Sequence, residues 1–111
     1  MSQPEIIDRV YDVILERRRE RPAGSYVVTL LEGGPDAIAA KVREEAEELI
    51  EAAASADPAQ VAHEAADLLF HTLVLLGSVD VAPTRAYEVL EKRFGTGGLV
   101  EKATRERPDA E

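Results

Sequence analysis

Apolar residues recur at helical spacing in four long segments of the chain, and no segment shows the alternation that marks a β-strand. Capping residues, early prolines and terminal glycines set the expected helix limits at about residues 2–21, 34–56, 57–76 and 83–94. A short helical turn is expected over residues 26–31, and a partly irregular tail from about residue 96. The pattern predicts an all-α fold, a bundle of four main helices with a short C-terminal tail.

The length of 111 residues fits one domain over residues 1–111. The absence of cysteine excludes disulfides, thiolate zinc sites, iron–sulfur clusters and cysteine nucleophiles. The start of the chain lacks the basic and apolar regions of a signal peptide, and the longest apolar stretch, residues 68–76, is too short to span a bilayer. We therefore expect a cytoplasmic protein that does not bind membranes.

The net charge of −9 disfavours general nucleic-acid binding, because attraction to phosphates needs clustered lysine and arginine. A small anionic substrate remains compatible with this charge if the protein recruits metal cations. The acidic residues are therefore the first candidates for metal-binding or catalytic roles.

Five glutamates fall in the helix expected over residues 34–56, and helical phase separates them. At 100° per residue the apolar arc of this helix comprises Ile38, Val42, Leu49 and Ala53. Glu45 lies inside that arc and Glu48 at its edge, whereas Glu44, Glu47 and Glu51 project away from it. A run of acids is most often a solvated face. Glu45 does not fit that interpretation, because an ionised carboxylate in a core stripe costs free energy unless it is paired or bound to a metal.

The next helix places Glu64, Asp67 and His71 on one stripe of an otherwise apolar segment. The short turn at residues 57–58 makes the two helices antiparallel neighbours. Their facing stripes then bring four carboxylates around one point: Glu45, Glu48, Glu64 and Asp67. Such a group shares a buried site only if its pKa values rise or a cation lies among its members.

The residue types around this point favour a hard divalent cation. Oxygen ligands suit Mg²⁺ or Mn²⁺, whereas a zinc site would want more histidine. A di-iron bundle would want Glu-x-x-His pairs, and the sequence contains none. We expect His71 to be a buried, hydrogen-bonded neighbour of the site rather than a metal ligand.

The arrangement Glu44-Glu45-x-x-Glu48 followed by Glu64-x-x-Asp67 resembles the signature of the all-α, MazG-type nucleoside triphosphate pyrophosphohydrolases. Within that superfamily the chain is most similar to the phosphoribosyl-ATP pyrophosphohydrolase family. The segments that carry the resemblance are residues 24–31, 41–48, 64–76 and 93–102. Arg43 stands where the family often has a small residue, and Gly97 where it often has serine, so neither departure touches an acidic position.

The resemblance implies hydrolysis of phosphoribosyl-ATP to phosphoribosyl-AMP and pyrophosphate, the second step of histidine biosynthesis. It also implies a Mg²⁺ site, with Mn²⁺ as a substitute, whose ligands and catalytic carboxylates are Glu45, Glu48, Glu64 and Asp67. Cleavage between the α- and β-phosphates needs charge neutralised on a polyanion and a water made nucleophilic, and metal ions do both. Glu44 is expected to be a supporting or ion-paired residue.

Candidate contacts to the substrate are Lys41, Ser25, Tyr26, Arg93 and Lys102. Each has a plainer alternative. Lys41 can instead pair along its helix with Glu45 or Glu48, and Tyr26 can fill the core with its hydroxyl in water. For Arg93 and Lys102 an ordinary surface role is the stronger alternative.

Two other functions fit the same residues. One is a house-cleaning nucleoside triphosphate pyrophosphatase, which would use the same metal site on ordinary or damaged nucleotides. The other is a non-catalytic acidic helical adaptor, which gives no reason for Glu45 to lie in an apolar stripe. In each case the apolar third main helix is difficult to bury in one short chain, so a homodimer is expected.

Overall fold

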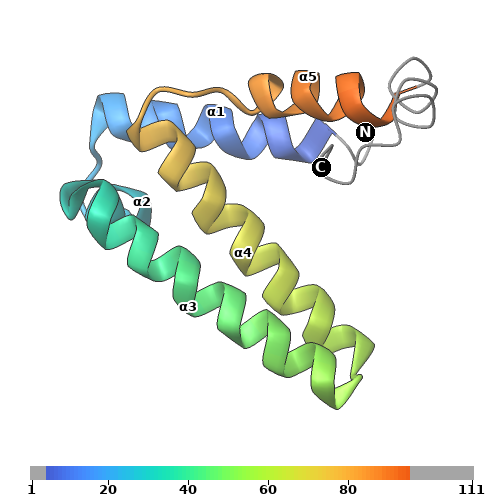
Figure 1. Ribbon diagram of the computed structural model, residues 1–111. Coiled ribbons are helices and arrows are strands. Elements are labelled where there is room, and N and C mark those ends of the chain that lie inside the picture. Colours follow the sequence, from blue (N-terminus) through green and yellow to red (C-terminus); the bar gives the residue numbers. More distant parts are fainter. Residues whose placement is uncertain (1–4, 96–111) are drawn as a thin grey trace. The chain divides into compact units, whose positions relative to one another are not determined.

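The computed structural model describes residues 5–95. Its helices are α1 (Glu5–Glu20), α2 (Tyr26–Glu32), α3 (Gly34–Ser55), α4 (Pro58–Ser78) and α5 (Pro83–Phe94), shown in Figure 1. No strand occurs between residues 5 and 95, so the predicted all-α class is confirmed. The chain divides into two compact units, Met1–Val81 and Ala82–Glu111. The single-domain expectation stays a prediction.

Local capping explains where the helices begin. The Ser25 hydroxyl accepts a hydrogen bond from the Val28 amide at 3.3 Å and caps α2. The Asp57 carboxylate accepts from the Ala59 amide at 3.1 Å and caps α4. Proline stands in the first turn of α3, α4 and α5, where its missing N–H group costs nothing. The expected start at residues 2–4 and the tail from residue 96 lie outside the described residues.

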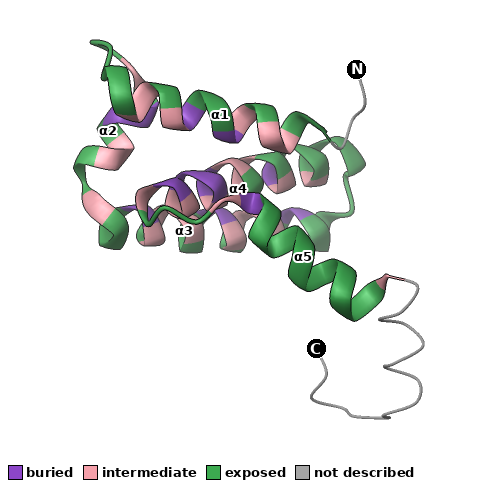
Figure 2. Ribbon diagram, turned by 90° about the horizontal axis from the view of Figure 1, so that it is seen from above, coloured by how far each residue is buried: buried purple, intermediate pink, exposed green. Residues whose placement is uncertain are grey.

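Helix α4 is the central helix of the first unit, since it packs against α1, α2 and α3. The most deeply buried side chains are Ile14, Ile38 and Val74, which come from α1, α3 and α4. Figure 2 shows this buried surface along the facing sides of the three helices. The central place of α4 agrees with its apolar sequence.

The buried positions of α3 repeat every seven residues, at Ile38, Glu45 and Ala52. The expectation that Ala53 completes the apolar arc is wrong, because Ala53 is exposed and Ala52 is buried. A helix that runs along a neighbour keeps its contacts at a spacing of about 3.5 residues, whereas a 100° step drifts by about 20° per heptad. The same spacing places Glu45 against α4.

Arg18 joins the end of α1 to the end of α4. Its Nη1 atom donates to the Gly77 carbonyl at 2.6 Å and to the Asp80 carboxylate at 2.8 Å. A carbonyl in the last turn of α4 lacks a partner within the helix, so a guanidinium there satisfies it. This contact fixes α1 on α4 at the end remote from Glu64.

Within residues 5–95, no single helix combines the length and apolarity needed to cross a membrane; only α4 and α5 taken together meet that requirement.

Candidate functional site

Three glutamates meet where α3 faces α4. Glu45 and Glu48 come from α3 and Glu64 from α4, and each offers a carboxylate oxygen within 4.8 Å of the others. Glu45 is 7% exposed and Glu64 9% exposed, which is rare for carboxylates. Glu44, Glu47 and Glu51 are exposed, so the helical phase expected for these acids is confirmed.

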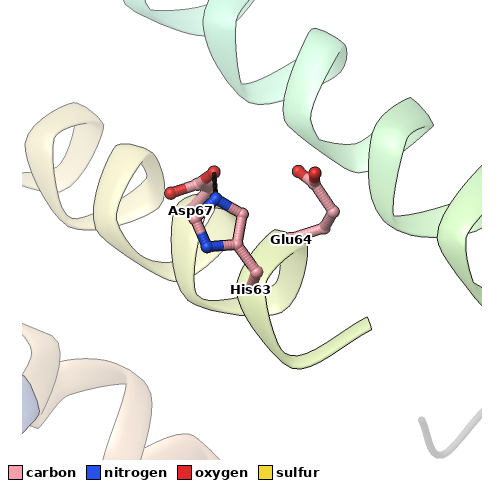
Figure 3. A group of neighbouring side chains, drawn as sticks. All are labelled: His63, Glu64 and Asp67. Carbon is pink, nitrogen blue, oxygen red and sulfur yellow. Dashed lines mark ion pairs between the residues drawn. The ribbon is translucent and has the colours of Figure 1, made fainter. Parts of the chain in front are cut away.

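A second group shares one member with the first. His63, Glu64 and Asp67 also offer ligand atoms within 4.8 Å of one another (Figure 3). The His63 Nε2 atom lies 3.4 Å from the Asp67 Oδ2 atom, while the Glu64 carboxylate turns toward α3. The structure therefore brings the four predicted carboxylates into two overlapping groups, with Glu64 in both.

The two buried glutamates of this group, Glu45 and Glu64, are short of partners. The Oε1 atoms of Glu45 and Glu64 are buried and have no hydrogen-bond partner among the described residues. The negative charge of Glu45 raises the pKa of Glu48, with smaller contributions from desolvation and from a hydrogen bond with Glu64. Crowded anions with unpartnered buried oxygens are what a cation would relieve. The donor set, oxygen with one nearby imidazole, fits Mg²⁺ or Mn²⁺.

Each of three carboxylates at the site is held by a different neighbour one turn away. Glu64 accepts a hydrogen bond from Gln60 Nε2 to its Oε2 atom at 2.7 Å. Asp67 faces His63 as described above. Glu45 Oε2 lies 3.9 Å from Lys41 Nζ.

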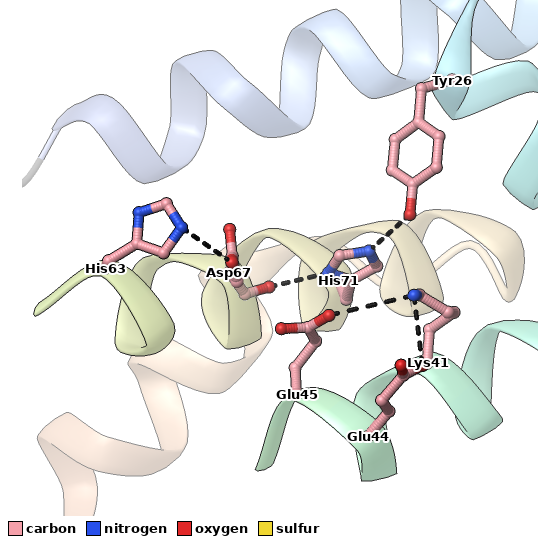
Figure 4. A network of polar contacts seen from close by, with 7 residues as sticks. All are labelled: Tyr26, Lys41, Glu44, Glu45, His63, Asp67 and His71. Carbon is pink, nitrogen blue, oxygen red and sulfur yellow. Dashed lines mark hydrogen bonds and ion pairs between the residues drawn. The ribbon is translucent and has the colours of Figure 1, made fainter. Parts of the chain in front are cut away.

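Lys41 lies beside Glu44 and Glu45 on α3, and its ammonium faces both carboxylates (Figure 4). Its Nζ atom pairs with Glu44 at 3.2 Å as well as with Glu45. The hydrogen bond with Glu44 is the main cause that raises the pKa of Lys41, so the ammonium is firmly charged. The intrahelical pairing foreseen for Lys41 is thus observed with Glu45, and Glu44 is ion-paired as expected.

His71 links the site to α2. It is 5% exposed, and its Nδ1 atom lies 2.8 Å from the backbone carbonyl of Asp67. A carbonyl only accepts, so Nδ1 donates, and in the neutral ring Nε2 accepts from the Tyr26 hydroxyl at 3.0 Å (Figure 4). The buried, hydrogen-bonded role expected for His71 is confirmed. Tyr26 is half exposed and stacks on Phe70 with ring centroids 6.2 Å apart.

The other predicted substrate contacts have separate places. Ser25 uses its hydroxyl to cap α2. Arg93 is exposed in the last turn of α5, in the second unit. Lys102 lies outside the described residues. Their roles toward a substrate stay predictions.

Sequence reasoning missed Gln60 and His63 as neighbours of the acidic site. Each precedes its carboxylate by four residues on α4, which is one helical turn. That spacing is present in the sequence, but it is common on helix surfaces and carries little information until the acids themselves are known to gather at one site.

Comparison with known proteins agrees with this geometry. Residues 7–94 match the family described as phosphoribosyl-ATP pyrophosphohydrolase. The chain is 48% identical over 104 residues to the phosphoribosyl-ATP pyrophosphatase of Geobacter sulfurreducens, which covers 94% of this chain and 96% of that protein. It is 46% identical over 102 residues to the phosphoribosyl-ATP pyrophosphatase of Rhodopirellula baltica, covering 89% and 85% respectively.

A fused relative shows the same similarity over part of its length. The histidine biosynthesis bifunctional protein HisIE of Deinococcus radiodurans is 48% identical over 93 residues, which are 84% of this chain and 43% of that protein. Relatives that match nearly end to end, together with the family match, decide the assignment. The chain belongs to the phosphoribosyl-ATP pyrophosphohydrolase family.

Proposed function

We propose that this chain hydrolyses phosphoribosyl-ATP to phosphoribosyl-AMP and pyrophosphate, with Mg²⁺ held by Glu45, Glu48, Glu64 and Asp67. The reaction is that of the family and of the relatives named phosphoribosyl-ATP pyrophosphatase. The observation that carries the metal site is the pair of buried, unpartnered oxygens on Glu45 and Glu64, which lie on facing helices. Mn²⁺ is the expected substitute, because it prefers similar ligands.

The family's reaction breaks one phosphoric anhydride bond with water. A bound divalent cation would neutralise phosphate charge and make a water more acidic. The chain's own part would be to bind and orient, since the carboxylates of Glu45, Glu48 and Glu64 already lie within 4.8 Å of one another. A site arranged in advance avoids reorganising its dipoles and charges during the reaction.

Lys41 is the proposed phosphate contact from the first unit. Its Nζ atom already lies within 3.9 Å of the ligand Glu45, so a phosphate bound beside the metal would be within its reach. Tyr26 and Ser25 at the start of α2, and Arg93 and Lys102 from the second unit, are the proposed contacts to the rest of the substrate.

A substrate panel tests the proposed function against the house-cleaning alternative. We would compare kcat/KM for phosphoribosyl-ATP, ATP, dUTP and dCTP at one Mg²⁺ concentration, measuring pyrophosphate release. One good charged contact to the additional ribose phosphate is worth ~1.5–3 kcal/mol, so phosphoribosyl-ATP should lead by about tenfold to a hundredfold. Equal or better turnover of a plain nucleotide would contradict the substrate while leaving the metal site in place.

We also propose that the enzyme is a cytoplasmic homodimer. In the described part of the first unit, an apolar groove of about 190 Å³ between α1 and α4 has Ile6 and Leu69 about half exposed on it. A second copy of the chain would cover such a surface, and a chain without cysteine suits a reducing compartment. Light scattering should give twice the mass of 12.1 kDa, and a monomer at micromolar concentration would contradict the dimer.

A further inference from the structure

We propose that Gln60 is a positioning residue for the metal site: its amide holds Glu64 so that the other carboxylate oxygen is presented to the cation. The inference rests on the proposed function. It assigns a role to a residue that neither the acidic signature nor the family comparison singles out.

One short hydrogen bond to Glu64 leaves the other oxygen of the same carboxylate unpartnered. Gln60 Nε2 donates to Glu64 Oε2 at 2.7 Å. The remaining oxygen, Oε1, is buried without a partner, and Glu64 as a whole is 9% exposed. The Glu64 carboxylate turns toward α3 (Figure 3). Glu45 and Glu48 of α3 each offer an oxygen within 4.8 Å of it.

Fixing one oxygen of a glutamate limits the rotation of its carboxylate. A free glutamate side chain loses rotamer freedom when it binds a metal, and that loss weakens affinity. A neighbour that holds the carboxylate beforehand removes part of this loss. Partners of this kind in metal sites commonly change metal affinity by 10- to 100-fold.

The chemical type of Gln60 matters as well. Lys41, which faces Glu45, carries a positive charge and so competes with a cation for that carboxylate. The Gln60 amide is neutral, so it orients Glu64 without cancelling the charge that attracts the metal. Unlike Lys41, Gln60 leaves the full negative charge of its carboxylate for a cation.

An ordinary helix contact is the competing explanation. A Gln–Glu pair spaced by four residues stabilises an exposed helix by only about 0.2–0.5 kcal/mol and has no effect on a ligand. Gln60 is itself exposed, so replacing it should not disturb the core. The two explanations separate in metal affinity, since only a positioning role links Gln60 to the cation.

The test is Mn²⁺ binding by calorimetry, and by the electron paramagnetic resonance signal of free Mn²⁺, in the full chain without substrate. Gln60→Met keeps the length of the side chain and removes the donor. Gln60→Asn keeps the amide but shortens the side chain, so that it no longer reaches Glu64. We expect both variants to raise the Mn²⁺ Kd about tenfold, with the metal-free melting temperature nearly unchanged.

A Kd within twofold of wild type in Gln60→Met would overturn the proposal, and so would a wild-type Kd in Gln60→Asn. These outcomes leave the metal site intact. If the wild-type chain itself binds no Mn²⁺, the metal site of the proposed function fails and the role of Gln60 fails with it. The wild-type titration therefore separates the two failures.

Discussion

The two sides of α4 differ in chemistry, since one is apolar and the other acidic. Toward α1, the helix lines an apolar groove with Ala66, Leu69, Phe70 and Leu73. Toward α3, it presents Glu64 to Glu45 and Glu48, with buried oxygens that no described residue satisfies. The same helix thus gains stability on one side by burying hydrocarbon and gives up stability on the other by burying charge.

The difference teaches where function resides in this fold. A sequence selected for stability alone would place apolar residues at Glu45 and Glu64, because a buried apolar side chain contributes about 1.5–3 kcal/mol. Carboxylates at those positions make sense only if something binds there. The two sides should therefore respond in opposite ways to substitution.

The largest effect should follow loss of an acid from the group formed by Glu45, Glu48 and Glu64. Glu64→Gln and Glu48→Gln each remove one oxygen charge from the proposed metal site, and we expect turnover to fall by more than about a hundredfold. The matched controls are Glu47→Gln and Glu51→Gln, which make the same chemical change on exposed positions of α3. They should leave turnover nearly intact, and comparable losses in all four variants would show that helical phase does not distinguish these acids.

A substitution on the apolar side of α4 should lower stability rather than metal affinity. Leu73 is 5% exposed and lines the groove, so Leu73→Ala should lower the free energy of unfolding by about 2–5 kcal/mol. Its Mn²⁺ affinity, measured below the melting temperature, should stay within a few fold of wild type. Denaturant unfolding measures the loss of stability, and calorimetry measures the Mn²⁺ affinity. A large loss of affinity with little loss of stability would remove the contrast between the two sides.

Neutralising a buried acid should stabilise the protein when metal is absent. Glu64→Gln relieves repulsion from Glu45 and Glu48, and we expect the free energy of unfolding in a chelator to rise by ~1 kcal/mol. Chemical denaturation of both proteins in the same buffer measures it. A variant less stable than wild type would mean that the metal-free site is already satisfied.

The smallest effect concerns pH. The charge of Glu45 raises the folded-state pKa of Glu48 above its ordinary value of 4.5. Between the unfolded and folded values the folded protein holds more protons, so the free energy of unfolding falls as pH rises through that window. Metal-free wild type should lose stability relative to Glu48→Gln as pH rises from 4.5, and the difference should then level off. A difference independent of pH would mean that Glu48 is not crowded.

The helix limits could be predicted because their signals are local. Ser25, Asp57 and the prolines at 35, 58 and 83 act on adjacent backbone groups, and the helices begin where these residues place them. The burial of Glu45 could also be predicted, since helical phase is a property of one segment. The burial of Ala52 in place of the expected Ala53 could not be predicted. Which of the two residues faces α4 depends on how α3 packs along that helix, and the sequence of α3 alone does not contain this information.

The finer parts of the site could not be predicted for the same reason. Gln60 is an exposed polar residue in an ordinary spacing, and its contact has meaning only once Glu64 is seen to be buried. The bond from Tyr26 to His71 joins residues 45 positions apart. The Tyr26–His71 contact depends on how α2 packs against α4. No sequence pattern marks this contact or the one between Gln60 and Glu64.

Melting curves with and without divalent metal test the central claim most directly, that the α3–α4 carboxylates exist to hold a cation. At a Mg²⁺ or Mn²⁺ concentration of about 100 times Kd, binding adds about 2.7 kcal/mol to the stability of wild type. For a domain of this size that is a rise in Tm of roughly ten degrees or more. Glu64→Gln should show little of this rise. An identical midpoint with and without millimolar metal in wild type, or an equal rise in Glu64→Gln, would contradict the account.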